Sequence, residues 1–396
     1  MKDEVLASMP EVLRLTRAGR LQEATAAIQR VLGSQATASA VNELTRRAEK
    51  APIEGVFRIL NEEPPQPNDV PQVRPARPRP QPVPDRAPDS VPGGQFITGS
   101  YTNHAGTRTY KLYIPSGYRK QPLPLVVMLH GCTQNPDDFA AGTRMNQLAE
   151  EQSCLVLYPA QAQNASTLKC WNWFKESDQH RDRGEPSIIA GITREIMSAY
   201  HVDPQRVYIA GLSAGGAMAV IMGTTYPDLY AAAGIHSGLP YAAAHDLPSA
   251  YAAMREGNKT NGGMRKGKAR RIQVGERIIP IIVFHGDRDT TVHPCNGARV
   301  IAQFQAILVN NTTGPKVRLR PQATVQRGQV ENGHAYTRNI YHDASGQANV
   351  ELWLVHGAGH AWSGGSSSGS FTDPRGPNAT QEMMRFFLEH PKFTCH

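Results

Sequence analysis

The sequence has few cysteines, no long apolar run and no apolar leader segment. Five cysteines among 396 residues are too few for a disulfide scaffold, and their odd number leaves at least one thiol unpaired within a monomer. No run approaches the roughly 18 apolar residues that a membrane-spanning helix needs. The first twenty residues contain Asp3 and Glu4 and lack the apolar core of a secretory signal peptide. These absences predict no transmembrane segment and favour a cytoplasmic location.

Basic residues are in excess, and most of the excess lies in one short segment. The formal net charge is +8, and seven Lys and Arg residues against a single acid place a net +6 between residues 259 and 277. This segment contains glycines where a nucleic-acid-binding surface would present aromatic side chains for stacking. We therefore predict a solvated, flexible loop and no nucleic-acid partner, with attraction of anionic ligands as the alternative.

Proline is also concentrated in one place. Eleven of the 30 prolines lie between Pro64 and Pro92, in a stretch with almost no large apolar residues. Proline fixes φ and removes an amide donor, so this run favours extended polyproline II geometry and cannot form a core. We interpret residues 61–94 as a linker, and a proline motif that binds a partner is the alternative.

Residues 1–60 form a separate segment with helical periodicity. Apolar residues recur at steps of three and four from Leu6 to Val31, with arginines between them. A helical extension of this kind either docks on the main domain or binds a partner, a membrane or a hydrophobic granule surface. About 300 residues remain from residue 95 to residue 396, enough for one large domain.

In this large domain, short apolar runs alternate with helical segments. A β-hairpin is predicted first, at residues 95–115. The apolar runs predicted to be parallel strands are Leu123–Leu129, Cys154–Tyr158, Arg206–Ala210, Ala231–Ile235, Ile279–Phe284 and Val350–Val355. The predicted helices are Asp137–Gln152, Ser187–Tyr200, Ala214–Thr225, Ala298–Leu308 and Thr380–Glu389. This alternation is typical of the α/β class, with a mostly parallel sheet flanked by helices on both faces.

Ser213 lies at the centre of a Gly-x-Ser-x-Gly motif, Gly211-Leu212-Ser213-Ala214-Gly215. The motif alone is common in a chain with 35 glycines, but here it follows a predicted strand and precedes a predicted helix. A tight strand–turn–helix needs small residues two positions on either side of the serine, since larger side chains would collide with the neighbouring elements. Ser213 is therefore predicted to be the nucleophile of an α/β-hydrolase.

A nucleophilic serine needs a base and an acid, which follow it in α/β-hydrolases in the order Ser, Asp, His. We prefer Asp289 as the acid, because it completes an H-G-x-x-D-x-x-V arrangement that begins at His285; Asp287 is the alternative. We prefer His360 as the base, because it lies in a glycine-rich turn after the last strand, whereas His356 ends that strand.

The reaction also needs donors for the oxyanion and a surface that binds substrate. Backbone amides normally serve as donors, one directly after the nucleophile and one in the loop after the third strand, here Ala214 and Cys132. The predicted substrate-binding residues are Gln134, Trp171, Trp173 and Trp362, and a place in the core is the alternative for the tryptophans. This chemistry calls for no metal and no cofactor.

As a set, the motifs resemble those of the polyhydroxybutyrate depolymerase family of esterases. They are LHGCTQ, CWNWF, GLSAGG, HGDRDTTVHPCNG and GAGHAWSGG, in this order, and the resemblance covers about residues 95–390. It implies an α/β-hydrolase that cleaves short-chain hydroxyalkanoate esters, polymeric or oligomeric, with Ser213, Asp289 and His360 as its triad. It further implies a disulfide between Cys132 and Cys170, and hence an oxidising compartment and secretion in place of the cytoplasm.

Other functions remain open at this point. Secreted depolymerases of this type carry a separate polymer-binding domain, which the 36 residues after His360 are too few to form. The family also includes feruloyl and acetylxylan esterases, so the aromatic residues could accept an aryl or sugar ester, or the protein could be a general carboxylesterase. A granule- or partner-binding protein acting through residues 1–94 is an alternative of another class. The basic insert at residues 259–277 is expected to be a lid over Ser213.

Overall fold

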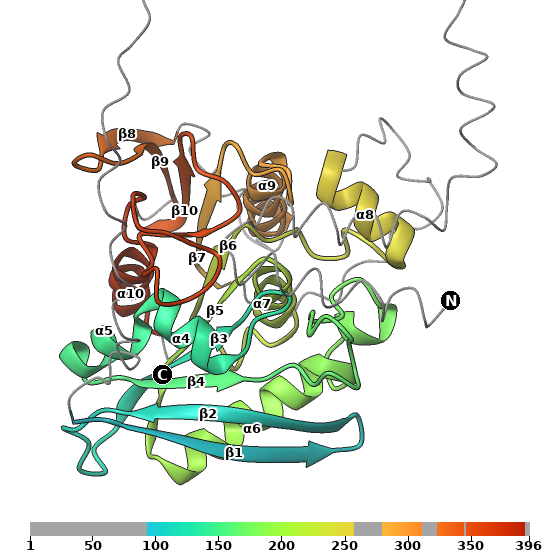
Figure 1. Ribbon diagram of the computed structural model, residues 1–396, viewed down its shortest axis with the longest axis vertical. Helices are drawn as coiled ribbons and strands as arrows, with labels where there is room; N and C mark the ends of the chain where they lie inside the picture. The colour runs from blue at the N-terminus through green and yellow to red at the C-terminus, as the bar shows by residue number, and fades with distance from the viewer. Residues whose placement is uncertain (1–92, 257–278, 311–322, 344–345, 393–396) are drawn as a thin grey trace, which may run out of the picture. The chain divides into compact units, whose positions relative to one another are not determined.

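The computed structural model describes residues 93–256, 279–310, 323–343 and 346–392 (Figure 1). The predicted helical extension at residues 1–60, almost all of the linker at 61–94 and the basic insert at 259–277 lie outside these residues. The division of the chain into these parts, and the role of the insert as a lid, therefore stay predictions.

The centre of the fold is a ten-stranded sheet (Figure 1). In spatial order its strands are β1 (Gln95–Asn103), β2 (Gly106–Ile114), β4 (Leu155–Pro159), β3 (Leu123–Leu129), β5 (Val202–Leu212), β6 (Ala232–His236), β7 (Ile281–Gly286), β10 (Ala348–Val355), β9 (Ala335–His342) and β8 (Thr324–Gln329). The six strands from β4 to β10 in this order run parallel, and antiparallel strands flank them at both edges. The loops after the parallel strands therefore meet at one edge of the sheet, where open α/β folds place their sites.

Helices cover both faces of the sheet and enclose two separate cores. One core contains α4 (Pro136–Thr143), α5 (Met145–Gln152) and α10 (Ala379–Glu389), and the other contains α6 (Gly184–Ala199), α7 (Ala214–Thr225), α8 (Leu247–Glu256) and α9 (Cys295–Asn310). Strand side chains alternate between them: Val126 and Met128 of β3 enter the first core, while Leu125 and Val127 enter the second. The short elements are η1 (Glu176–Gln179), β11 (Trp362–Ser363) and β12 (Thr372–Asp373).

The predicted α/β architecture is confirmed, with its parallel strands, its hairpin and its helices on both faces, and most boundaries shift by only a few residues. One predicted helix, Asp137–Gln152, is instead two. Arg144 has a left-handed backbone, with φ 55° and ψ 24°, which ends α4 and precedes α5. A non-glycine residue in this conformation interrupts the hydrogen bonds of an α-helix without any marker in the sequence.

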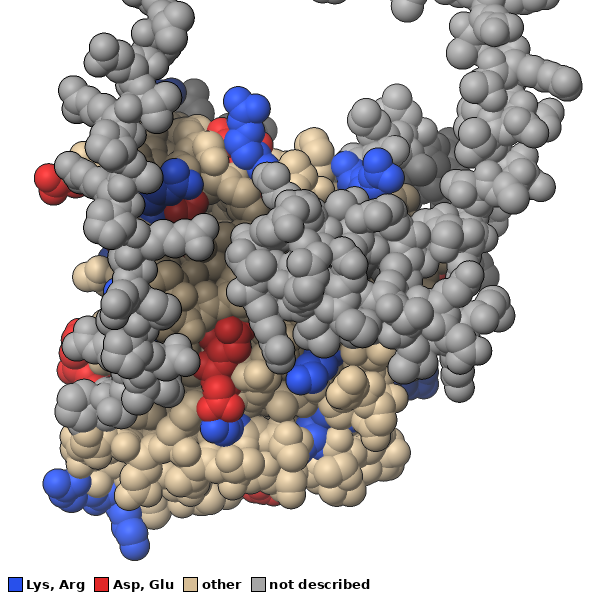
Figure 2. Space-filling view, viewed as in Figure 1, with Lys and Arg blue, Asp and Glu red and all other residues tan. Residues whose placement is uncertain are grey.

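The β8–β9 hairpin and α8 have no counterpart among the elements predicted from the sequence. Strand β8 has the polar sequence TVQRGQ, and five of its six residues are exposed, so no burial pattern marks it as a strand. On the face shown in Figure 2, acidic and basic side chains lie in small separate groups among uncharged residues. The described atoms on this face form no continuous basic surface.

Candidate active site

Ser213 occupies a sharp turn between β5 and α7. Its backbone has φ 58° and ψ −118°, a strained combination for a residue with a side chain. A Cβ atom on Gly211 would lie 2.3 Å from the carbonyl oxygen of Gly215, and one on Gly215 would lie 2.0 Å from that of Leu129. Both flanking positions therefore require glycine. The turn is fixed by the Ser213 amide, which donates to the carbonyl oxygen of His236 at 2.9 Å.

Asp289 and His360 form a hydrogen-bonded pair at the same edge of the sheet. Nδ1 of His360 lies 2.7 Å from Oδ2 of Asp289, whose side chain is buried. The other carboxylate oxygen accepts the amides of Thr291 and Val292 at 2.9 and 2.8 Å. Burial raises the pKa of Asp289, but His360 and His285 outweigh burial and hold this pKa well below its usual range. The ionised carboxylate keeps the proton of His360 on Nδ1, which leaves Nε2 free as a base.

The alternative acid, Asp287, makes a different pair. Its Oδ2 lies 3.0 Å from Nδ1 of His356, and its Oδ1 accepts the Gly357 amide at 2.7 Å. Nε2 of His356 in turn lies 2.8 Å from Oγ1 of Thr337 on β9. Asp287 thus holds the start of the turn that carries His360 at its end, and among the described residues it forms no hydrogen bond with His360 itself.

A third contact, next to Gly286, joins the loop that carries Asp289 to the turn that carries His360. The Arg288 amide donates to the carbonyl oxygen of Ala358 at 3.0 Å. A Cβ atom on Gly286 would lie 2.4 Å from that same oxygen and 2.6 Å from that of Gly359. Gly286 therefore lets the two backbones approach each other. This close approach explains why the motif HGDRD has a glycine at its second position.

The loop after β3 is braced around one free amide. The Gly131 amide donates to Oε1 of Gln134 at 2.9 Å, and the Thr133 amide donates to the carbonyl oxygen of Leu168 at 2.6 Å. Between them, the amide of Cys132 has no acceptor among the described residues. A braced loop with one unused N–H group is what an oxyanion site requires.

This loop lies beside the nucleophile. A Cβ atom on Gly131 would be 3.6 Å from Cβ of Ser213, so the two turns are about one methyl group apart. Ala214 is the first residue of α7, where helical amides have no partner within the helix, and no described residue accepts its N–H. The amides of Cys132 and Ala214 thus lie on two turns that pass close to each other at Ser213.

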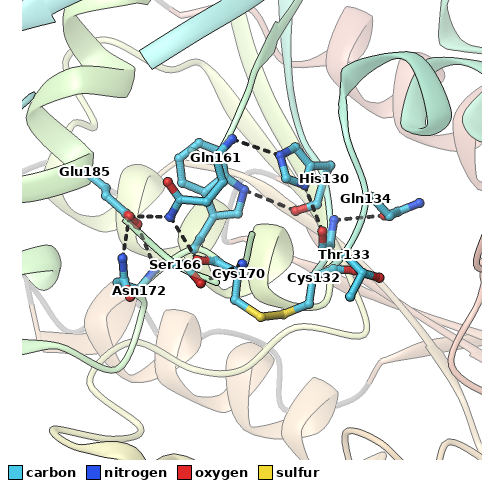
Figure 3. Close-up of a disulfide and its surroundings, with 11 residues drawn as sticks. His130, Cys132, Thr133, Gln134, Gln161, Ser166, Cys170, Asn172 and Glu185 are labelled. Atoms are coloured by element: carbon cyan, nitrogen blue, oxygen red, sulfur yellow. Dashed lines mark hydrogen bonds between the residues drawn. A yellow bond between two sulfur atoms is a disulfide. The ribbon is translucent and has the colours of Figure 1, made fainter. Parts of the chain in front are cut away.

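A disulfide between Cys132 and Cys170 ties this loop to the loop after β4 (Figure 3). The ring of His130 supports the same junction, because its Nε2 accepts the Gln161 amide at 3.0 Å. The indole of Trp171 donates to the carbonyl oxygen of His130 at 3.1 Å. Burial lowers the pKa of His130 to about 4, so the ring is neutral at physiological pH and can act as an acceptor.

A buried carboxylate anchors the aromatic loop (Figure 3). Glu185 at the start of α6 accepts the backbone amide and the side-chain amide of Asn172 at 2.7 and 2.6 Å, and also the side chain of Gln161. Arg108 on β2 approaches the same carboxylate at 3.3 Å. The asparagine of CWNWF is therefore the loop's anchor. Neither Asn172 nor Glu185 was predicted from the sequence. The only sequence signal for them is that each is a polar residue next to apolar ones.

The side chains predicted to bind substrate are buried. Exposed fractions are 0% for Trp171, 1% for Trp362, 2% for Gln134 and 6% for Trp173. Trp362 donates to Oγ1 of Thr380 at 2.9 Å, and Gln134 uses both ends of its amide within the protein. Burial and the internal hydrogen bonds of Trp171, Trp362 and Gln134 favour a role in bracing the loops around Ser213, and substrate binding by these four residues stays a prediction.

The described residues contain no group of three or more His, Cys, Asp or Glu side chains placed to hold a metal ion. No helix in the described ranges is long and apolar enough to cross a membrane.

The open parallel sheet with a serine at the strand–helix turn after β5 is the α/β-hydrolase fold. Residues 108–319, more than half of the chain, match the profile of the family described as Esterase PHB depolymerase. The chain therefore belongs to this family of ester hydrolases.

Individual relatives come from two branches. Poly(3-hydroxyalkanoate) depolymerase C of Paucimonas lemoignei is 32% identical over 263 residues, which cover 65% of this chain and 59% of that protein. Probable acetylxylan esterase A of Aspergillus fumigatus is 28% identical over 239 residues, covering 56% and 61%. The solved acetyl xylan esterase from Aspergillus awamori matches the fold with a TM-score of 0.55 at 19% identity, over 74% of this chain and 99% of that one. The chain spans about three-fifths of the length of these two curated relatives.

Proposed function

We propose that this protein is a serine-dependent carboxylic ester hydrolase with Ser213, His360 and Asp289 as its triad. The observation that carries the proposal is the 2.7 Å bond between His360 and the buried Asp289, at the sheet edge where Ser213 follows β5. Membership of an esterase family supports the same chemistry.

The steps follow from the groups in place. Nε2 of His360 takes the proton of the Ser213 hydroxyl as its oxygen attacks the ester carbonyl carbon. The negative charge that develops on the carbonyl oxygen is met by the amides of Ala214 and Cys132, and each such donor is worth about 2.7–4 kcal/mol of barrier. The protonated His360 then gives its proton to the leaving alkoxide, which departs as an alcohol. Water, deprotonated by His360, attacks the carbonyl carbon of the acyl-serine, the bond from this carbon to the Ser213 oxygen breaks, and His360 returns the proton to that oxygen as the acid leaves.

For the substrate, we favour a short-chain aliphatic polyester of the poly(3-hydroxyalkanoate) type or its oligomers. The relative with 32% identity is named a depolymerase of such a polymer. A second candidate, an acetyl ester on a polysaccharide, is supported by the acetylxylan esterases among the relatives.

Residues 1–60 and the linker at 61–94 are proposed to be separate from the hydrolase domain at 95–396 and to contact the polymer granule. Deletion of residues 1–92, followed by granule-binding assays, would test this role.

The direct test compares Ser213→Ala with the matched control Ser100→Ala, an exposed serine on the edge strand β1. We expect Ser213→Ala to lose hydrolysis of p-nitrophenyl butyrate by at least about 10³-fold, since the nucleophile is gone, and Ser100→Ala to keep it. Near wild-type activity of Ser213→Ala would refute the proposed triad. Rates on hydroxybutyrate oligomers, acetylated xylan and methyl ferulate would then rank the substrates.

A further inference from the structure

His236 links the two halves of the candidate site, although it belongs to neither. It is the last residue of β6, which lies between β5 and β7, and it is 1% exposed. Through its backbone carbonyl it accepts the amide of Ser213 at 2.9 Å. The position of the nucleophile is therefore tied to this residue by its main chain.

Its side chain holds the other half. Nε2 of His236 accepts the amide of Ser363 at 3.0 Å, so the ring proton lies on Nδ1, which faces Oγ of Ser237 at 3.2 Å. The ring stacks on Trp362 with centroids 5.1 Å apart and on Phe284 with centroids 5.9 Å apart. Trp362 and Ser363 follow His360 by two and three residues. The segment that follows His360 is thus held by His236, the same residue whose backbone carbonyl holds Ser213.

Only a neutral imidazole makes all these contacts at once. It needs an unprotonated Nε2 to accept, an Nδ1–H to donate and a flat face to stack, and a protonated ring would lose the bond to Ser363. Burial lowers the pKa of His236 to about 3, with His285 and His360 adding to the effect, so this form persists throughout the neutral range.

We propose that His236 is a positioning residue that sets the separation of Ser213 and His360, acting through the Ser363 amide without contacting the substrate. The inference rests on the proposed esterase function. A misplacement of about 1 Å between reacting groups costs on the order of 10²-fold in rate, so one lost anchor at this point has a measurable effect.

Three variants separate the contacts. His236→Phe keeps the ring stacking and removes both ring nitrogens. His236→Asn can replace only the contact that Nδ1 makes with Ser237. His236→Gln can place a hydrogen-bond acceptor where Nε2 lies, opposite the Ser363 amide. We expect kcat per titrated active site to fall about 10- to 100-fold in His236→Phe and His236→Asn, with KM changed less than about threefold, and to recover to within about fivefold of wild type in His236→Gln. The rate of inactivation by phenylmethylsulfonyl fluoride, which needs His360 next to Ser213, should follow the same order.

The matched control is His390→Phe. His390 is also buried, and its ring nitrogens lie at hydrogen-bond distance from two backbone carbonyls, but it lies at the end of α10, outside the site. We expect this variant to lose thermal stability and to keep kcat per active site. Equal kcat in His236→Phe and wild type, or equal losses in His236→Gln and His236→Phe, would overturn the proposal. The esterase function would still stand in both cases, because it fails only if the wild type is inactive or Ser213→Ala is active.

Discussion

At the scale of single residues, burial distinguishes the two carboxylates of the HGDRD motif. Asp287 and Asp289 each face a histidine Nδ1, at 3.0 and 2.7 Å. The Asp289 side chain is 0% exposed and that of Asp287 is 32% exposed, so water screens the Asp287 pair and not the Asp289 pair. Asp289 therefore stabilises a charged His360 ring more strongly than Asp287 stabilises a charged His356 ring.

This inequality gives a paired prediction. Asp289→Asn should lower kcat by about 10³- to 10⁴-fold, since the amide no longer fixes the tautomer of His360 or stabilises its cation. Asp287→Asn should lower kcat by no more than about tenfold, because it only loosens the start of the turn. Steady-state kinetics on p-nitrophenyl butyrate, with thermal unfolding to confirm folding, would measure both. The reverse order would identify Asp287 as the acid.

The proximity of Asp289 and His360 could be predicted because both residues follow strands, and parallel strands bring their ends together. Asp289 and His360 are 71 residues apart, yet both come after strands of one sheet, and the structure joins them. The supporting residues could not be predicted in this way. The contact between His236 and Ser363 spans 127 residues and uses a backbone amide, which leaves no side-chain signature at Ser363.

At the scale of elements, the close approach of two loops depends on a missing side chain. Gly286 ends β7 where the turn after β10 passes over it. Strand periodicity located β7 but gave no information on this packing, because the distance between two loops depends on the twist of the whole sheet. The left-handed break at Arg144 between α4 and α5 was not visible in the apolar pattern either, because a non-glycine residue in this conformation leaves no marker in the sequence.

Gly286→Ala should therefore act on catalysis through the backbone. The new methyl group would lie 2.4 Å from the carbonyl oxygen of Ala358, so the turn that carries His360 must shift. We expect at least a tenfold loss of kcat and about 1–3 kcal/mol of destabilisation, as for other overpacked sites. Gly117→Ala is the control, since its Cβ atom would meet nothing within 4 Å. Activity and unfolding by urea would report both effects, and an unchanged kcat in a folded Gly286→Ala protein would contradict the argument.

At the scale of the whole molecule, the fold buries two neutral histidines at strand ends. His130 follows β3 and His236 ends β6; burial lowers their pKa values to about 4 and about 3. In the unfolded chain both titrate near 6.5. Their neutral rings hold the junction beside the loop that carries Cys132 and the segment that follows His360, so these contacts also make the stability of the domain depend on pH.

The sign of this dependence follows from proton counting. About one pH unit above 6.5, both states leave these rings almost entirely unprotonated, and their contribution to stability is nearly complete. Between about pH 6.5 and pH 4 the unfolded chain binds up to two more protons than the folded protein. The free energy of unfolding therefore falls with falling pH, at up to about 2.7 kcal/mol per pH unit. Urea unfolding at pH 7.5, 6 and 5 would show the loss, and His236→Gln, which removes one of the two groups, should show about half the slope. A free energy of unfolding that stays constant from pH 7.5 to pH 5 would contradict this prediction, because it would mean that both rings are charged in the folded protein. A charged ring carries a proton on each nitrogen. It could therefore not accept the backbone N–H group that Nε2 of His130 and Nε2 of His236 each accept in the structure.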